Sequence, residues 1–421
     1  MIQASLLERR PAERVRQSGS GQPEAAEVVM DVAGLLSRWR GLAPTGIDRV
    51  EMAYAQALVR RAPDRVSFAG LHPGLGYARF PNAVVLDYLA VTREAWARGV
   101  AGGLGEARRR AAFKAMLGAR PVFEAPKAER RVYLHLSPRG LERRRDYEAV
   151  LRRERAKLAV FVHDLIPVER PEFVADESGS RFRRRLETLV ELADGVLVNS
   201  RATADAVAPH LARAGRRTTV RIAPLGLSPA APSAAPPRAK PYFVVLGAIE
   251  PRKNHLLLLH IWRRWAEHAG SEATPTLVIV GGRGWENENI LDLLDRSPIL
   301  RAVIEERGGL GDDAVRALIR GARAVLCPSF AEGYGLPIAE ALDLGAPVLA
   351  SDIPAHREVG GAAAEYLDPL DGPAWMAAVR DYARPDSEAR ERQLKRLAAW
   401  RRPEWGDHFQ VAFDLIDEIA R

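Results

Sequence analysis

The sequence is poor in several features that would point to other classes of protein. Its 421 residues contain one cysteine, Cys327, so no disulfide can form within the chain, and we expect a reducing compartment. No apolar run approaches the roughly 20 residues that a membrane-spanning helix needs, and the longest, at 158–168, is interrupted by His163 and Asp164. Residues 1–26 lack the apolar core of a signal peptide and are expected to form a disordered lead-in. We therefore expect a cytoplasmic protein.

Lysine is also scarce, and the positive charge is unevenly distributed. Arginine outnumbers lysine 56 to 6, and the formal net charge is +8. Residues 1–230 carry 39 Lys and Arg against 26 Asp and Glu, whereas residues 231–421 carry 23 against 28. The excess is concentrated at 139–157 and 181–187. A solvated helix face and contact with an anionic membrane or lipid-linked acceptor both remain open, and no nucleic-acid partner is predicted.

The length of the chain favours two domains. Pro, Ala and Ser dominate residues 228–240, which show neither a helical nor a strand period and are expected to form a linker. We expect one domain at 27–227 and a second at 241–400. Residues 401–421 have the apolar spacing of an amphipathic helix, which we expect to pack back on the first domain.

The second half alternates between buried strands and amphipathic helices. Strands are expected at 242–249, 276–282, 324–329 and 347–351, and helices at 255–269, 311–322 and about 337–344. The first half repeats this theme less regularly, with strands expected at 27–36, 157–166 and 195–200 and a helix at 201–215. Such alternation is typical of parallel sheets covered by helices. We predict an α/β fold with two doubly wound, Rossmann-like domains, whose ligands bind beyond the carboxyl ends of the strands.

The segment PSFAEGYGLPIAEAL (328–342) follows one of these predicted strands. Gly333 and Gly335 have no side chains, so backbone amides can approach a ligand closely there. The N-terminus of the helix that follows directs positive charge toward a phosphate or a developing anion. Glu332, before the helix, and Glu340, in its first turns, are therefore predicted to contact one ligand at two points.

Seven segments, in one order, resemble glycosyltransferase family 4, whose members have two Rossmann-like domains facing across a cleft in the GT-B arrangement. The first half contributes APTGIDRV (43–50), FVHDLIP (161–167), NSRATAD (199–205) and APLGL (223–227). The second half contributes GAIEPRKNH (247–255), VIVGGRGW (278–285) and the stretch 327–361. The resemblance covers about residues 30 to 410, and it implies a retaining hexosyltransferase that uses a nucleotide sugar.

The resemblance also implies roles for individual residues. Glu332 would lie by the hydroxyls of the donor sugar, and Glu340 would bind the ribose. His163 would reach the donor sugar from the first domain, so His163 and Glu332 are the predicted catalytic residues. The predicted donor-binding residues are Arg252, Lys253, Gly333, Tyr334, Gly335, Leu336, Glu340 and Gly46. Asp164 and His135 are weaker candidates for the acceptor side, and Asp164 could instead orient the histidine or cap a turn.

Arg252 and Lys253 are expected to hold the diphosphate leaving group, whose charge grows as the glycosidic bond breaks. Many members of the family carry an arginine where Ala248 stands, so Arg252 would have to replace it here. No Asp-x-Asp pair follows a strand, and we predict no bound metal and no other cofactor. The resemblance implies front-face transfer, in which the departing phosphate helps to deprotonate the incoming hydroxyl.

The sequences of the motifs most resemble those of family members that transfer mannose from GDP-mannose in O-antigen and exopolysaccharide assembly. UDP-sugars remain open as donors. The acceptor would be a lipid-linked glycan or polysaccharide, and the enzyme could be peripheral on the inner face of the cytoplasmic membrane. Two other interpretations are retained, a GT-B nucleotide-sugar epimerase and a non-catalytic protein that binds ligands through a basic surface.

Overall fold

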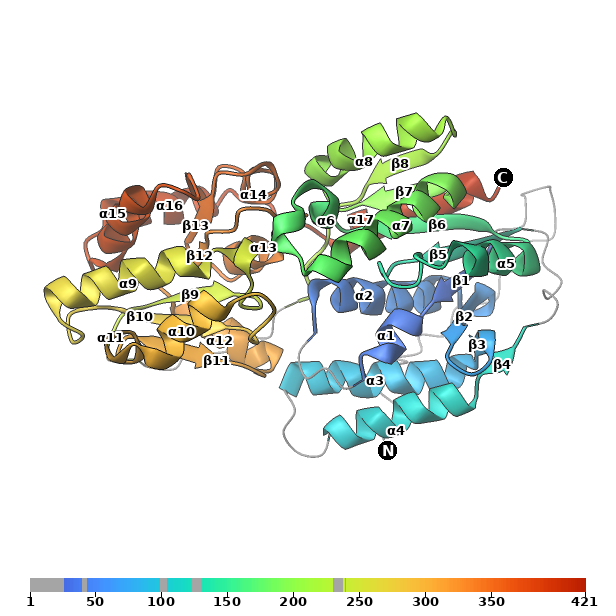
Figure 1. The fold of residues 1–421 in the computed structure, drawn as a ribbon, viewed down its shortest axis with the longest axis horizontal. Coiled ribbons are helices and arrows are strands. Elements are labelled where there is room, and N and C mark those ends of the chain that lie inside the picture. Colours follow the sequence, from blue (N-terminus) through green and yellow to red (C-terminus); the bar gives the residue numbers. More distant parts are fainter. Residues whose placement is uncertain (1–25, 40–43, 99–103, 123–129, 230–237, 239) are drawn as a thin grey trace, which may run out of the picture.

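The protein folds into two lobes, each built on its own sheet (Figure 1). The computed structural model describes residues 26–39, 44–98, 104–122, 130–229, 238 and 240–421. The expected lead-in and most of the expected linker lie outside these residues. Among the helices of the described part, none is long and apolar enough to cross a membrane.

The first lobe contains an eight-stranded sheet in the order β4-β3-β2-β1-β5-β6-β7-β8. Six strands run parallel, and β3 and β4 form an antiparallel edge. The strands are β1 (Glu27–Asp31), β2 (Val66–His72), β3 (Gly76–Phe80), β4 (Arg120–Pro121), β5 (Arg131–His135), β6 (Lys157–Val162), β7 (Gly195–Val198) and β8 (Thr219–Ile222). The helices are α1 (Ala33–Ser37), α2 (Gly46–Arg61), α3 (Asn82–Arg98), α4 (Leu104–Leu117), α5 (Arg144–Glu154), α6 (Ile166–Glu169), α7 (Asp176–Leu192) and α8 (Arg201–Ala214), with 3₁₀ turns η2 (Pro63–Arg65) and η3 (Pro171–Phe173).

The second lobe contains a six-stranded parallel sheet in the order β11-β10-β9-β12-β13-β14. Its strands are β9 (Tyr242–Leu246), β10 (Thr276–Val280), β11 (Ile304–Arg307), β12 (Val325–Cys327), β13 (Val348–Ser351) and β14 (Glu365–Leu367). Its helices are η4 (Pro251–Lys253), α9 (His255–Ala269), α10 (Glu288–Arg296), α11 (Pro298–Arg301), α12 (Asp312–Gly321), α13 (Leu336–Asp343), α14 (Pro354–Gly360), α15 (Gly372–Ala383) and α16 (Glu388–Leu397). The predicted α/β class with two parallel sheets is confirmed.

The first strand is shorter than the sequence pattern predicted. An extended segment was expected over 27–36, but the strand ends at Asp31 and α1 follows. The Asp31 carboxylate accepts a hydrogen bond from the backbone N–H of Ala33 at 2.9 Å, which turns the chain. Gly34 then lies so close to Ser137 and Glu51 that a Cβ atom there would stand 2.7 to 2.8 Å from their oxygens. Local hydrogen bonding therefore overrides an apolar run that is typical of a strand.

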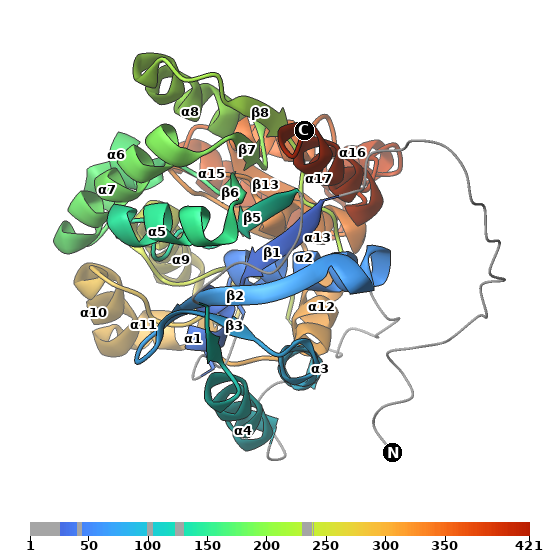
Figure 2. The ribbon, with the colours of Figure 1, turned by 90° about the vertical axis from the view of Figure 1, so that its right-hand side faces the viewer.

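The last helix, α17 (Trp405–Ile419), leaves the second lobe and lies against β7 and β8 of the first (Figures 1 and 2). His408 fixes it there, because one ring nitrogen lies 2.8 Å from the Tyr54 hydroxyl and the other lies 3.0 Å from the backbone oxygen of Ala223. Burial lowers the pKa of His408 to about 4, so the ring is neutral near pH 7. The chain therefore crosses between the lobes a second time at this helix.

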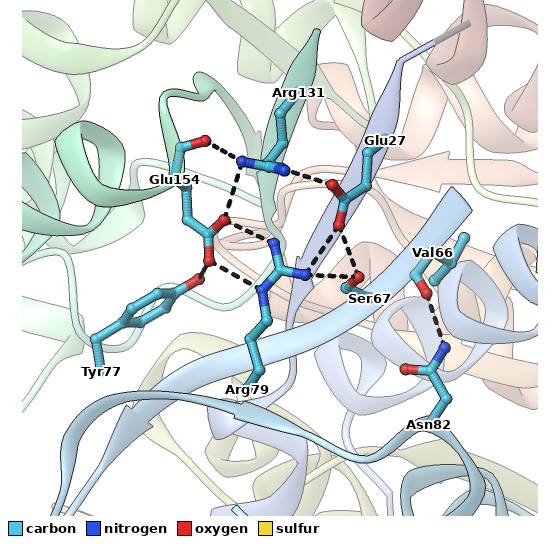
Figure 3. Close-up of polar contacts among 8 residues, drawn as sticks. All are labelled: Glu27, Val66, Ser67, Tyr77, Arg79, Asn82, Arg131 and Glu154. Carbon is cyan, nitrogen blue, oxygen red and sulfur yellow. Dashed lines mark hydrogen bonds and ion pairs between the residues drawn. The ribbon is translucent and has the colours of Figure 1, made fainter. Parts of the chain in front are cut away.

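A buried ion network ties strands together where β1 and β5 begin (Figure 3). Arg79 binds Glu154 through two hydrogen bonds of 2.6 and 3.0 Å and reaches Glu27 at 3.0 Å. Arg131 binds Glu27 at 2.7 Å and lies 3.4 Å from the Glu154 carboxylate. Tyr77 donates a further hydrogen bond to Glu154 at 2.7 Å. Two arginines and two glutamates neutralise each other here, and the Glu154 side chain is fully buried.

Candidate active site

Two cations follow β9 and meet one carboxylate that follows β12. Nζ of Lys253 lies 2.5 Å from Oε1 of Glu332, and Nη1 of Arg252 lies 2.6 Å from Oε2. Ser329 donates a hydrogen bond to Oε1 of Glu332 at 2.8 Å. Because β9 and β12 are neighbours in a parallel sheet, their carboxyl ends bring these loops together. The structure thus joins three of the residues that the sequence predicted to act together.

The backbone conformation of η4 presents the two cations. Asn254 ends this turn in the left-handed region, with φ 54°, and its side-chain amide donates to the backbone oxygens of Pro328 and Pro369 at 3.2 and 3.0 Å. Asparagine tolerates this conformation better than most residues. The amide of Asn254 therefore connects the cation turn to the β12 loop that carries the glutamate.

The charges in this cluster perturb one another strongly. Burial pushes the pKa of Glu332 up, but the charges of Arg252 and Lys253 outweigh burial and hold the pKa well below its usual range. The neighbouring Glu250 lies 3.3 Å from Arg252, yet burial and the charge of Glu332 leave its pKa raised. The two cations therefore lower the pKa of Glu332, which stays ionised, but do not overcome the effect of burial on the pKa of Glu250.

The glycine loop places a helix N-terminus at the same point. Gly335 precedes α13 with φ 108°, a conformation that side chains rarely adopt. Gly335, Pro337 and Ile338 line a water-sized cavity of about 10 Å³ together with Lys253 and Glu332. The positive end of the α13 dipole therefore adds to the two cations.

The backbone of His163 approaches this loop from the first lobe, and the sugar contact predicted for its side chain stays a prediction. A Cβ atom on Gly333 would stand 2.1 Å from the backbone oxygen of His163, so only glycine permits the approach. Nε2 of His163 lies 2.8 Å from the backbone oxygen of Leu136 and so carries the proton of the neutral ring. Burial lowers the pKa of His163 to about 4, so the ring is uncharged near pH 7.

Asp164, next to His163, caps the turn that starts α6. Its Oδ1 accepts a hydrogen bond from the backbone N–H of Ile166 at 3.1 Å. Burial raises the pKa of Asp164 even though the charge of Arg252 opposes the shift. The carboxylate therefore serves a local turn and also belongs to the electrostatic surroundings of the cation pair.

Tyr334 and Gly333 hold the two lobes together. The Tyr334 hydroxyl is buried and donates to the backbone oxygen of Leu225 at 2.9 Å. Ser200, at the start of α8, donates to the backbone oxygen of Gly333 at 2.7 Å. The hydroxyl of Tyr334 is thus committed to the other lobe, and its predicted contact with the donor stays a prediction.

Glu340 faces a different space from Glu332. It lines a cavity of about 260 Å³ between the lobes, together with Arg49, Asp312, Trp96 and Trp405. Burial raises the pKa of Glu340, and the nearby Asp312 adds to this shift, while Arg49 opposes it. Glu332 therefore lies at the two cations, whereas Glu340 lies in a cavity large enough for part of a ligand.

An ion pair closes one wall of this cavity across the two lobes. Arg49 on α2 binds Asp312 at the N-terminus of α12 through two hydrogen bonds of 2.6 and 3.0 Å. Three residues earlier, Gly46 opens α2 and faces Leu336, since a Cβ atom on the glycine would stand 3.3 Å from the leucine methyl. The sequence singled out Gly46 and Leu336 but assigned no role to Arg49, because its partner lies 263 residues away.

His135 lies away from both cavities in a buried polar cluster. Its Nδ1 is 3.2 Å from Oδ2 of Asp31 and 3.3 Å from the Tyr147 hydroxyl, and Tyr133 donates to the same Asp31 oxygen at 2.8 Å. Only 1% of the His135 residue is exposed. The acceptor-side role predicted for it stays a prediction, and the contacts observed are structural.

Sequence reasoning missed His356. It lies at the water-sized cavity beside Glu332 and Lys253, and its Nδ1 is 3.0 Å from the backbone oxygen of Ser351. Burial lowers the pKa of His356 to about 4, although the charge of Glu332 opposes this shift. Its position just beyond the carboxyl end of β13 was the available signal, because neighbouring parallel strands present their ends to one site.

The space between the lobes thus combines two cations that can bind a diphosphate, the Glu332 carboxylate and the neutral ring of His356 beside them. A second carboxylate, Glu340, lies in the 260 Å³ cavity. The cations and the α13 N-terminus can stabilise an anionic leaving group. Glu332, His163 and His356 can form hydrogen bonds with hydroxyl groups of a sugar. This arrangement suits the transfer of a group that leaves a phosphate behind.

Comparison with protein families places a match on the second lobe. Residues 231–367 match the family model described as Glycosyl transferases group 1. The serotype-specific mannosyltransferase WbdA of Escherichia coli is 29% identical over 256 residues, which is 54% of this chain and 31% of WbdA. The O-antigen chain mannosyltransferase B of Escherichia coli is 34% identical over 146 residues, or 35% of this chain and 38% of that protein. The matched region thus spans about a third of these relatives.

Comparison with solved structures supports the fold. Sucrose-phosphate synthase of Thermosynechococcus elongatus has a TM-score of 0.57 at 15% identity, over 92% of this chain and 97% of that one. HepE of Anabaena, in complex with UDP and glucose, has a TM-score of 0.56 at 13% identity, over 92% and 98%. The fold is therefore the GT-B arrangement, as the resemblance in the sequence predicted.

Proposed function

We propose that this protein is a retaining glycosyltransferase that moves mannose from GDP-mannose onto a lipid-linked glycan or polysaccharide acceptor. The observation that carries the proposal is the cluster of Arg252, Lys253 and Glu332 at the α13 N-terminus, with the backbone of His163 from the other lobe beside Gly333 of the same loop. The mannosyltransferase names of the relatives support the choice of sugar.

The two lobes would bind different parts of the donor. The diphosphate binds the two cations and the α13 N-terminus, and the ribose lies by Glu340 in the 260 Å³ cavity. The sugar then extends from the cations toward His163 and Glu332. The nucleotide is bound by the second lobe, while the first lobe supplies the contact to the sugar and the surface for the acceptor.

The proposed chemical step takes place on one face of the sugar. The bond from C1 to the phosphate oxygen breaks as the acceptor hydroxyl forms a bond to C1 from the same side. The departing phosphate oxygen takes the proton of that hydroxyl, and the two cations stabilise the charge that develops on the diphosphate. Because these cations neutralise the leaving group, we propose that transfer needs no metal, and expect chelating agents to leave the rate unchanged.

The acceptor is proposed to bind at the basic first lobe. The positive excess in the first 230 residues supports contact with an anionic membrane surface or with the phosphate of a lipid-linked acceptor. The protein would then be a peripheral enzyme of the cytoplasmic membrane. The O-antigen relatives support a growing polysaccharide as the acceptor.

A thermal-shift comparison of GDP, UDP and ADP tests the proposal, because a ligand that binds only the native state raises the melting temperature. We expect the largest shift with GDP, followed by mannose transfer from GDP-mannose to an acceptor. A larger shift with UDP would move the proposal to a UDP-sugar donor. The absence of any shift would contradict the transferase and favour a basic-surface binding protein.

A nucleotide-sugar epimerase with the same fold is separated by its product. It would release an altered sugar in the absence of any acceptor. A transferase instead forms a glycoside whose amount depends on the acceptor. Analysis of the products with and without acceptor therefore decides between these two enzymes.

A further inference from the structure

Helix α4 buries mainly small side chains, while two of its large apolar side chains, Phe113 and Leu117, are exposed. Its buried residues are Ala111, Ala112 and Ala115, together with Arg108, whose guanidinium lies 5.9 and 5.7 Å from the ring centres of Tyr88 and Trp96 on α3. Alanines on this side allow α4 to pack closely on α3. A helix that only covered a core would place its largest apolar groups on this inner side.

The outer side of α4 carries an exposed apolar pair. Phe113 is 63% exposed and Leu117 is 71% exposed. They are four residues apart, so they lie next to each other on one face of the helix. The other large apolar side chains that are exposed in the described part, Leu75, Trp285 and Leu370, come from three separate segments. Only α4 gathers two of them into a patch.

Basic side chains surround this pair. Arg109, Lys114 and Arg120 are exposed, and within the described ranges none of them has an ion-pair partner that compensates its charge. Arg110 is exposed as well and forms an ion pair with Glu106 at 3.3 Å. An apolar pair bordered by uncompensated cations is the composition of a helix that lies in the interface of an anionic membrane.

The position of α4 leaves this face accessible. In both views α4 lies at the lower margin of its lobe, beyond α3 (Figures 1 and 2). Trp96 on α3 touches Arg108 of α4 and also lines the 260 Å³ cavity that contains Glu340. A flat surface that meets α4 would therefore lie one helix away from the space between the lobes.

We propose that Phe113 and Leu117 insert into the interface of an anionic lipid bilayer while Arg109, Lys114 and Arg120 bind its headgroups. These five residues are called the α4 face below. The proposal deepens the membrane contact proposed above by naming the element that makes it, and it does not depend on the choice of donor. It also distinguishes α4 from the arginine-rich segment 139–157, whose helix α5 is the alternative basic surface.

Co-sedimentation with lipid vesicles tests the α4 face in the full-length chain. The vesicles are phosphatidylcholine alone or mixed with phosphatidylglycerol, at low and high salt. The double variant Phe113→Ser/Leu117→Ser should bind the mixed vesicles about tenfold more weakly than the wild type, since it removes two apolar anchors. The matched control is Leu370→Ser, which removes a side chain that is 79% exposed in the second lobe and should leave binding unchanged.

Charge reversal compares the two basic surfaces. Arg109→Glu/Lys114→Glu and Arg152→Glu/Arg153→Glu change the net charge equally, the first on α4 and the second on α5. The first should abolish the preference for phosphatidylglycerol, and the second should weaken it by less. A stronger loss from the α5 variant, with Phe113→Ser/Leu117→Ser unaffected, would overturn the proposal and assign the membrane contact to α5.

Two further results would also overturn it. If the wild type dimerises with increasing concentration and Phe113→Ser/Leu117→Ser prevents this in sedimentation velocity, the α4 face is an interface between copies of the chain. If the wild type binds no vesicles yet gives a thermal shift with GDP, the membrane contact fails while the nucleotide-binding part of the proposed function stands. The variants must keep the wild-type melting temperature, which exposed positions favour.

Discussion

Two buried ion clusters of this protein contain the same kinds of side chain but lie at opposite ends of the strands, one where strands begin and the other where strands end. The cluster of Figure 3 lies where strands begin, and its charges come from the strands β1, β3 and β5 and the end of α5. The cluster around Glu332 lies where β9 and β12 end, and its charges come from the short turn η4 and the loop after β12. Both clusters contain two cations, so the end of the strands at which they lie, and not their composition, makes only the second one a candidate ligand site.

The carboxylates of the two clusters also differ in how well they are compensated. Burial pushes the pKa of Glu27 up, but hydrogen bonds from Ser67 and Arg131 outweigh burial and leave the pKa lowered. At the other cluster the pKa values of Glu250 and Asp164 remain raised. Incompletely compensated carboxylates beside strong cations are typical of sites where a ligand completes the charge balance.

Among single substitutions, the largest effect is expected from breaking the network of Figure 3. Glu154→Gln would leave two buried arginines with one glutamate, which should lower the free energy of unfolding by about 3–5 kcal/mol. Urea denaturation measures this loss. The rate per folded molecule should stay at the wild-type value, because the network lies away from the cations. A loss of rate without a loss of stability would remove the contrast between the two clusters.

Lys253→Ala should have the opposite effect to Glu154→Gln, because it should lower the rate of transfer and leave the stability nearly unchanged. We expect turnover to fall about 100- to 1000-fold, because the alanine cannot stabilise the leaving diphosphate. The melting temperature should change little. Glu340→Ala should also lose turnover, through the ribose contact. Lys240→Ala is the matched control, since Lys240 pairs with the exposed Glu272 at 2.8 Å and takes no part in the cluster around Glu332. Wild-type activity in purified Lys253→Ala would contradict the assignment.

Acid should destabilise the fold through its buried histidines. The pKa values of His163, His356 and His408 are lowered to about 4 by burial, and that of His255 to about 3. Between pH 6.5 and 4 the unfolded chain binds protons at these rings and the native chain does not, so stability falls as the pH falls. A ring that is protonated in the unfolded chain and neutral in the native chain contributes at most about 1.4 kcal/mol per pH unit. Urea titrations across this range measure the slope, and a flat profile would contradict neutral rings.

The smallest effect is expected at Glu332, which binds both cations in the structure. Because this carboxylate competes with a diphosphate, Glu332→Gln should tighten the binding of GDP about threefold to tenfold. Sugar transfer should fall in the same variant, since the carboxylate is also the predicted contact to the sugar. Calorimetry and a turnover assay measure the two changes separately. Weaker GDP binding in Glu332→Gln would show that the carboxylate only supports the fold of the loop.

The sequence predicted the parts of the fold and site that depend on local patterns. Four strands of the second lobe, β9, β10, β12 and β13, and the helix α9 followed from apolar periodicity, whereas β11 and β14 were not predicted. The cation pair and Glu332 followed from their positions after strands. The antiparallel edge β3–β4 was not predicted, because β3 is short and β4 has only two residues. Contacts between distant residues were also out of reach, such as Arg49 with Asp312 or Tyr334 with Leu225.

The two lobes are proposed to divide the donor between them, since the second lobe would bind the nucleotide and His163 of the first lobe would contact the sugar. The close approach of Gly333 to the His163 backbone places this residue beside the glycine loop before α13, and the His163 ring bonds to Leu136 and not to Arg252 or Lys253. The most direct test is calorimetric titration of His163→Ala with GDP, paired with a turnover assay. We predict wild-type GDP affinity and a large loss of transfer. An equal loss of affinity and rate would contradict the division of labour.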